Sequence, residues 1–173
     1  MADLPWIKDT LVSLKLRDDL FSVAQFMDSP VLCCFRKSRQ QPQWEGLELS
    51  REDVLFQVFV GSVVLEKLVH AVIPPSVAKP VPGLETQRRW IKPKLHFGGS
   101  YPFKGGDLVE VDFVNKIGSA SAPVIKANLQ PSDPLVGEHE FSSVWGADHL
   151  RDRLSHVFDT GADLDPLKAK IFP

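Results

Sequence analysis

Cysteine is scarce in this sequence, and its two cysteines are neighbours. Cys33 and Cys34 lie together in an apolar run, residues 31–35. In a strand, adjacent side chains point to opposite faces, which disfavours a disulfide between them. A lone adjacent pair is not the disulfide framework of a secreted protein, and the N-terminus lacks the basic and apolar segments of a signal peptide. We therefore expect an intracellular, cytoplasmic protein.

The sequence also lacks a long hydrophobic run free of polar residues. Residues 54–73 come nearest in length, but Gln57, Glu66, Lys67 and His70 interrupt them. A Glu-Lys pair inside a bilayer is costly, whereas buried core segments of globular proteins have similar hydropathy. We expect no transmembrane segment.

The bulk composition is that of one globular domain. The chain has 173 residues, of which 43% are hydrophobic and 24% charged, and its formal net charge is -2. These values predict a single domain over residues 1–173 with a real hydrophobic core. Proline (14) outnumbers glycine (11), and residues 74–83 form a proline-rich connector. We expect this connector to be stiff and to join an N-terminal mixed part to a strand-rich C-terminal part.

The apolar spacing predicts an α+β fold. Helical spacing of leucines over residues 4–14 and a second apolar face over residues 18–27 predict N-terminal helices, followed by a buried strand at residues 31–36. A largely antiparallel sheet of about four to six strands should follow, and then a C-terminal amphipathic helix at residues 148–158. The later strands are predicted at residues 89–97, 108–115, 124–129 and 138–145.

Residues 54–73 support two interpretations. Their first half is rich in β-branched and aromatic residues, and Gly61-Ser62 suits a hairpin turn, which favours strands. Ser50 and Asp53 resemble a capping box, and Leu65, Leu68 and later apolar residues recur at helical spacing. We expect a helix in the second half and leave the first half open.

Five residues near the end, Asp159 to Asp163, resemble the DTGAD signature of retroviral-type aspartic proteases. In that family a flap and a second glycine-containing turn complete the site, and the short remainder of this sequence does not supply them. An amphipathic helix precedes the motif here. We expect Gly161 to end that helix as its left-handed C-terminal residue.

Four residues are weak candidates for a metal site. His149, Asp152 and His156 share one face of the predicted helix, and His139 lies on a predicted strand that could add a fourth ligand. None of the compact zinc spacings occurs, and arginines flank the cluster. We expect an exposed, salt-bridged helix face, with no metal and no cofactor.

Basic residues surround a tryptophan in one segment. The cluster comprises Arg88, Arg89, Trp90, Lys92 and Lys94. Cations that meet phosphates, beside a ring that stacks on bases, are typical of grooves that bind single-stranded nucleic acid or an anionic membrane surface. The alternative is a buried tryptophan with cations that reach water.

A loop between two glycine pairs is the predicted contact site. Tyr101, Pro102, Phe103 and Lys104 lie between these pairs, and an alternating apolar and polar strand follows. A phosphate-binding loop would lead into a helix instead, so we expect the glycines to serve turns or bulges.

These observations predict a non-enzymatic protein-interaction or assembly module that associates with a protein partner or with itself. One alternative is a binder of nucleic acid or anionic lipid headgroups through the basic residues near 88–104. The other is an enzyme whose site is assembled from scattered residues, with His139, His149, Asp152 and His156 as first candidates.

Overall fold

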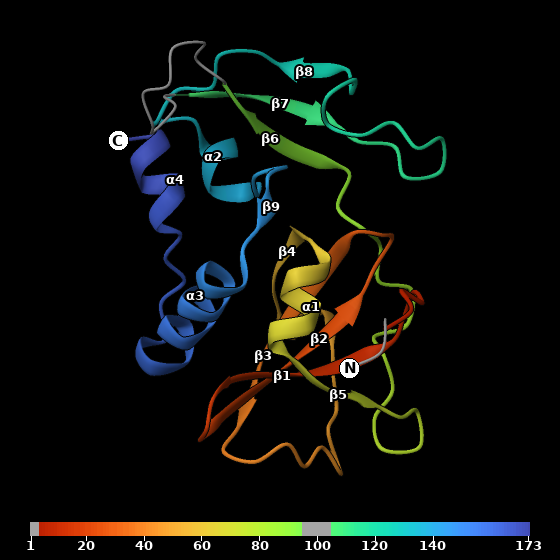
Figure 1. Ribbon diagram of the computed structural model, residues 1–173. Coiled ribbons are helices and arrows are strands. Elements are labelled where there is room, and N and C mark those ends of the chain that lie inside the picture. Colours follow the sequence, from red (N-terminus) through yellow and green to blue (C-terminus); the bar gives the residue numbers. More distant parts are fainter. Residues whose placement is uncertain (1–3, 95–104) are drawn as a thin grey trace. The chain divides into compact units, whose positions relative to one another are not determined.

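The computed structural model describes residues 4–94 and 105–173 (Figure 1). Over these residues the fold is mostly sheet, with two sheets, nine strands and four short helices, so the predicted α+β fold with a single sheet of about four to six strands is wrong. The chain forms two compact units, and it leaves and re-enters the first of them. Unit 1 comprises Met1–Thr86 and Val144–Leu164, and unit 2 comprises Gln87–Ser143 and Asp165–Pro173.

Unit 1 is built on a six-stranded sheet with the strand order β5-β1-β2-β3-β4-β9. Neighbouring strands are antiparallel, except that β9 runs parallel to β4. The strands are β1 (Leu11–Arg17), β2 (Leu20–Phe26), β3 (Val31–Arg39), β4 (Val54–Val60), β5 (Val69–Ile73) and β9 (Val144–Trp145).

The predicted N-terminal helices are wrong. Residues 11–26 form a β-hairpin, in which β1 and β2 pair from Leu11 opposite Gln25 to Arg17 opposite Leu20. Every residue of β2 is buried, and so are five of the first six of β1. Because the sheet is covered on both faces, apolar residues occur on both faces of each strand and hide the period of two. Their spacing then fits a helix by coincidence.

Residues 54–73 contain three elements. Strand β4 occupies the first part, helix α1 (Ser62–Leu68) the middle and β5 the end. The helix expected in the second half is therefore present but shorter than predicted. Gly61 precedes α1 as its N-cap and does not form a hairpin turn. The predicted capping box at Ser50 is also present, on a short 3-10 helix, η1 (Arg51–Asp53).

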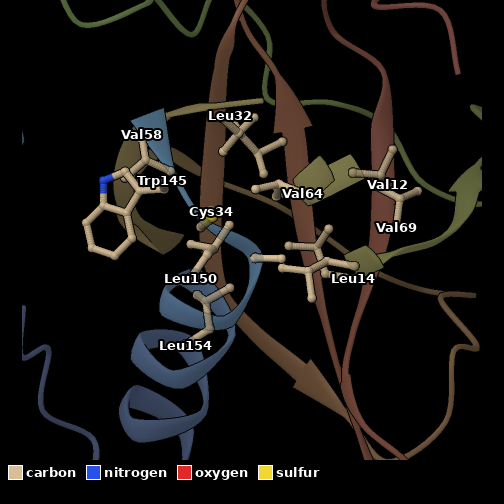
Figure 2. Close-up of a cluster of buried hydrophobic side chains, with 14 of the residues drawn as sticks. Val12, Leu14, Leu32, Cys34, Val58, Val64, Val69, Trp145, Leu150 and Leu154 are labelled. Atoms are coloured by element: carbon tan, nitrogen blue, oxygen red, sulfur yellow. The ribbon is translucent and has the colours of Figure 1, made fainter. Parts of the chain in front are cut away.

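One face of the unit 1 sheet packs against α1 and α3 (Ala147–Thr160). Figure 2 shows Cys34 of the sheet beside Leu150 of α3, and Val12 of the sheet on the far side of the same cluster. The predicted C-terminal amphipathic helix is thus confirmed. It begins one residue earlier than expected and buries the apolar stripe that the sequence displays.

The opposite face of this sheet carries a row of polar residues. Gln25, Cys33 and Gln57 lie directly opposite one another on β2, β3 and β4. All three are buried, and Gln25 has no exposed surface. A buried amide requires hydrogen-bond partners, and here most of them come from another part of the chain.

Residues 74–86, which we call the strap, supply these partners. The amide of Val81 donates to Oε1 of Gln25 at 3.0 Å, and Nε2 of Gln57 donates to the carbonyl of Glu85 at 3.0 Å. Nη2 of Arg51 donates to the carbonyl of Gly83 at 2.6 Å. The proline-rich segment predicted as a connector therefore lies within unit 1 and packs on its sheet.

Replacing Gln25 with leucine tests the strap. The Gln25→Leu change leaves the buried amide of Val81 without its acceptor, which costs about 2 kcal/mol of unfolding free energy. Urea denaturation measures this loss, and faster hydrogen exchange at the Val81 amide locates it in the strap. The same change at exposed Gln41 should alter stability by less than about 0.5 kcal/mol. Equal losses in the two variants would contradict the assignment.

The end of the strap gives stability a pH dependence. Partial burial acts to raise the pKa of Asp28, but hydrogen bonds from the Thr86 hydroxyl and from Lys8 lower it overall. The contribution of Asp28 is complete above the ordinary aspartate pKa of about 3.9 and is lost as the pH falls through the lower folded-state pKa. Between about pH 6 and pH 3, Asp28→Asn should lose less stability than the wild type. Glu45→Gln, an exposed control, should behave as the wild type does.

Unit 2 is built on a three-stranded antiparallel sheet. Its strands are β6 (Arg89–Pro93), β7 (Gly106–Glu110) and β8 (Val124–Lys126), in the order β6-β7-β8. Helices α2 (Pro134–Glu138) and α4 (Pro166–Ile171) accompany them. The core residues are Ile91, Leu108, Leu129, Val136, Phe141, Ile171 and Phe172. Strands were predicted near β6, β7 and β8, whereas α2 and α4 were not expected.

Candidate interaction surface

The predicted contact residues Tyr101, Pro102, Phe103 and Lys104 lie outside the described residues. The second glycine pair beside them is described. A Cβ atom on Gly106 would lie 2.8 Å from Cγ2 of Ile91 and 2.9 Å from the carbonyl oxygen of Lys92. Gly106 therefore permits the close approach of β7 to β6 and opens a strand, as predicted, rather than a phosphate-binding helix.

The basic cluster lies along β6 and its flanks, and neighbouring groups of unit 2 engage most of its cations. Arg88 lies 3.3 Å from the carboxylate of Glu110. Nζ of Lys92 donates to the carbonyl of Ala120 at 3.1 Å, and Lys94 donates to the side chain of Asn128. Arg89 is exposed. The anion-binding groove stays a prediction.

Trp90 is fully buried, whereas the nucleic-acid hypothesis requires its ring to stack on bases. Its indole N–H donates to the carbonyl of Gln87 at 2.8 Å. The described structure therefore offers cations on this strand without an exposed aromatic face beside them. Stacking on a base requires such a face.

The four weak metal candidates are divided between the two units. His149, Asp152 and His156 lie on α3 of unit 1, and His139 follows α2 in unit 2. His149 packs against Trp145, with 4.5 Å between ring centroids. Among the described residues, no group of three or more His, Cys, Asp or Glu side chains could hold a metal ion.

The environment of His139 favours its neutral form. Burial lowers the pKa of His139; the charge of Glu138 opposes this effect, and Arg89 and Lys168 add to it. His139 is half-buried within unit 2.

Neither Cys33 nor Cys34 forms a disulfide, and both are fully buried. Burial raises the pKa of the Cys33 thiol to about 12, so this thiol stays protonated at neutral pH. A catalytic cysteine requires a lowered pKa in a cationic or helix-terminal setting. Cys33 therefore serves the core.

The motif from Asp159 to Asp163 anchors the end of α3 to the sheet. Both Asp159 carboxylate oxygens accept hydrogen bonds from Arg17 at 2.8 Å, and these bonds lower the pKa of Asp159. Gly161 has the left-handed conformation, with φ of 77°, and ends the helix as predicted. Its carbonyl accepts a hydrogen bond from Arg36 at 3.2 Å. These contacts give the motif a structural role.

Asp163 binds a buried arginine. Arg153 has a side chain only 2% exposed, and its Nε and Nη2 donate to the two Asp163 oxygens at 2.7 Å each. The guanidinium also lies 3.8 Å from the ring centroid of Phe56 and 5.2 Å from that of Trp145. A planar cation between aromatic rings and a bidentate carboxylate is held firmly.

The two motif aspartates should differ in their effect on stability. Asp163→Asn removes the charge that faces buried Arg153 and should cost about 2 kcal/mol of unfolding free energy. Asp159→Asn should cost clearly less, because water screens the half-exposed pair with Arg17. Urea denaturation at low and high salt measures both losses. A larger loss for Asp159→Asn would contradict this view of the motif.

The two sheets of the described residues end in four edge strands, β5 and β9 in one sheet and β6 and β8 in the other. The edge at β9 is only two residues long, and at β6 the backbone of residues 140–142 bonds to Ile91. A strand edge presents backbone donors and acceptors to any extended chain that approaches it.

The β8 edge carries several features that obstruct pairing. The strand has only three residues, begins after Pro123, contains Lys126 and has a register irregularity against β7. Short length, proline, lysine and bulges are the devices by which proteins block association at sheet edges. The apolar side chains of Val124 and Ile125 are exposed there nonetheless.

The β5 edge lacks most of these features. It has five residues, VHAVI, with no carboxylate and no lysine or arginine. His70, Ala71 and Val72 are exposed, and the large side chain of Val72 keeps 45% of its surface accessible. Its own irregularity, opposite Ser13 and Leu14, leaves the stretch from Ala71 to Ile73 in regular register.

Backbone groups of β5 point outward at Val72. Phe26 N donates to Thr10 O at 2.9 Å, so Thr10 faces β2. Along β1 the backbone N–H and C=O groups of successive residues point to opposite sides of the strand. Those of Val12, two residues after Thr10, therefore also point to β2 and cannot bond to Val72, which lies opposite Val12 on β5. The N–H and C=O of Val72 therefore face away from β1. The β5 edge is the candidate interaction surface.

Sequence reasoning missed this surface because it assigned β5 to a helix. A signal was present, since β-branched residues dominate the end of that segment and Pro74-Pro75 follows it directly.

The chain matches, over residues 1–173, the model of a family described as a domain of unknown function, DUF8309, and it belongs to that family. No curated protein and no solved structure matches the chain. In the described residues no helix has both the length and the apolar character needed to cross a bilayer.

Proposed function

We propose that the chain is a non-enzymatic protein-interaction module that binds an extended partner segment along the edge of β5. The observation that carries this proposal is an exposed, uncharged edge strand with the N–H and C=O of Val72 directed outward. Strand addition to such an edge uses main-chain hydrogen bonds for affinity and neighbouring side chains for specificity.

The unit 1 sheet provides a rigid support for that edge. The sheet beneath β5 is closed on one face by two helices and on the other by the strap. The partner would therefore meet a preformed strand, and little conformational entropy would be lost on this side of the contact.

We further propose that the module works inside the cell. Neither Cys33 nor Cys34 forms a disulfide, and both are buried, which suits a reducing compartment.

Site-directed photo-crosslinking tests the proposed function. A photoreactive residue at Ala71 should capture one defined protein in cells, whereas one at Val63, exposed on α1, should not. The captured protein, once purified, should bind the full chain, and Val72→Lys should weaken that binding ~10-fold by placing an unmatched charge on the edge. Equal capture from the two positions would contradict the proposal.

A heparin column addresses the main alternative. The anion binder predicts that the chain is retained on heparin and that charge reversal at Arg88 and Arg89 abolishes this retention. That result, with no specific capture from Ala71, would favour the anion binder over the interaction module.

A further inference from the structure

We infer that the partner of the β5 edge is a second copy of this chain, joined by antiparallel β5–β5 pairing. This inference rests on the proposed function and specifies its partner. The two copies would form one continuous sheet through the six-stranded sheets of their first units.

Symmetry makes β5 suited to pairing with itself. Antiparallel pairing of one strand with its own copy has two-fold symmetry, so each surface meets an identical surface. The pairs already present between β1, β2, β3, β4 and β5 are all antiparallel, and a β5–β5 pair continues the same pattern.

The absence of charge on β5 favours a copy over a charged partner segment. Like charges placed opposite each other across strands are destabilising, so a strand that carries charge selects a partner of opposite sign. No residue of β5 carries a carboxylate, ammonium or guanidinium group. Self-pairing therefore opposes no like charges within the strand, whereas a charged partner segment would find no complement there.

The outward backbone groups of Val72 fix the register. If Val72 of one copy faces Val72 of the other, the two residues exchange both of their N–H to C=O bonds. The β-branched side chains then lie side by side on one face of the joint sheet, a favourable cross-strand pair. Pro74, two residues on, lacks an N–H and limits how far the ladder extends.

The resulting interface is small. Five residues a side bury less than the roughly 1,600 Å² of a standard interface, so the dimer should be weak and depend on protein concentration. Sedimentation velocity from about 5 to about 500 µM covers this range of affinity and should show the wild-type chain passing from monomer to dimer.

Two variants locate the interface. Val72→Lys should raise the dimer Kd at least ~10-fold, because it adds two facing ammonium groups at the centre of the pair. Val63→Lys makes the same change on α1, at a valine that is 52% exposed, and should leave the Kd unchanged. Circular dichroism and urea denaturation confirm that both variants fold.

A disulfide tests the register without relying on loss of binding. Facing residues of a hydrogen-bonded antiparallel pair have Cα atoms about 5.5 Å apart, which suits a disulfide. Under mild oxidation Val72→Cys should give a covalent dimer and Val63→Cys should not. The native thiols, Cys33 and Cys34, are buried and do not interfere.

A wild-type chain that stays monomeric at every concentration, with no covalent dimer from Val72→Cys, would overturn the inference. Dimers that Val72→Lys does not weaken would also overturn it. Capture of a different protein from Ala71 by a monomeric chain would reject the second copy and keep the proposed function. If neither a dimer nor a captured protein is found, both this inference and the proposed function are rejected.

Discussion

The six-stranded sheet of unit 1 has two broad faces, and both have to be kept from water by segments of the same chain. The two faces are covered by different chemistry. Helices α1 and α3 cover one face with apolar side chains, which needs only matching shape and area. The strap covers the other face through backbone hydrogen bonds to glutamine side chains. Each cover therefore depends on a different set of residues.

The strap explains why glutamines occur in the middle of a buried sheet. A proline-rich segment has few amides and cannot pair with itself as a strand does. Gln25 and Gln57 satisfy backbone groups that such a segment would otherwise bury without partners. In return, the strap provides hydrogen-bond partners for the buried side-chain amides of both glutamines. The same logic applies at Asp28, whose backbone and carboxylate both bond to the Thr86 hydroxyl.

Helix α3 was predicted correctly because one of its faces is exposed. Helix α3 shows a polar face between its apolar residues, so its period of 3.6 is visible and its end at Gly161 follows from local chemistry. Strands β1 and β2 are buried on both faces, so they show no period of two. Their leucines fit a helix equally well, and only the strap and the helices, which are distant in sequence, decide the outcome.

Functional residues were harder to predict for a related reason. The basic cluster and the His and Asp cluster were recognised by residue type, but most of the basic cluster's cations are engaged by nearby groups and Trp90 is buried. Helix α4 was missed although Asp165 and Pro166 are a cap and a first-turn proline, because so short a helix shows no periodicity. The β5 edge has no distinctive residue types at all, since a strand edge acts through its backbone.

Covering both faces of a sheet leaves its edges as the places where backbone groups still meet water. At one end of the unit 1 sheet the chain itself returns, and β9 adds to β4 in parallel. At the other end β5 has no such neighbour among the described residues, and it carries none of the charge that protects β8. An edge that is neither paired nor charged is open to unwanted pairing with other chains unless a specific partner binds it. Association at β5, as proposed, depends on backbone hydrogen bonding and requires no particular side chain dedicated to a ligand.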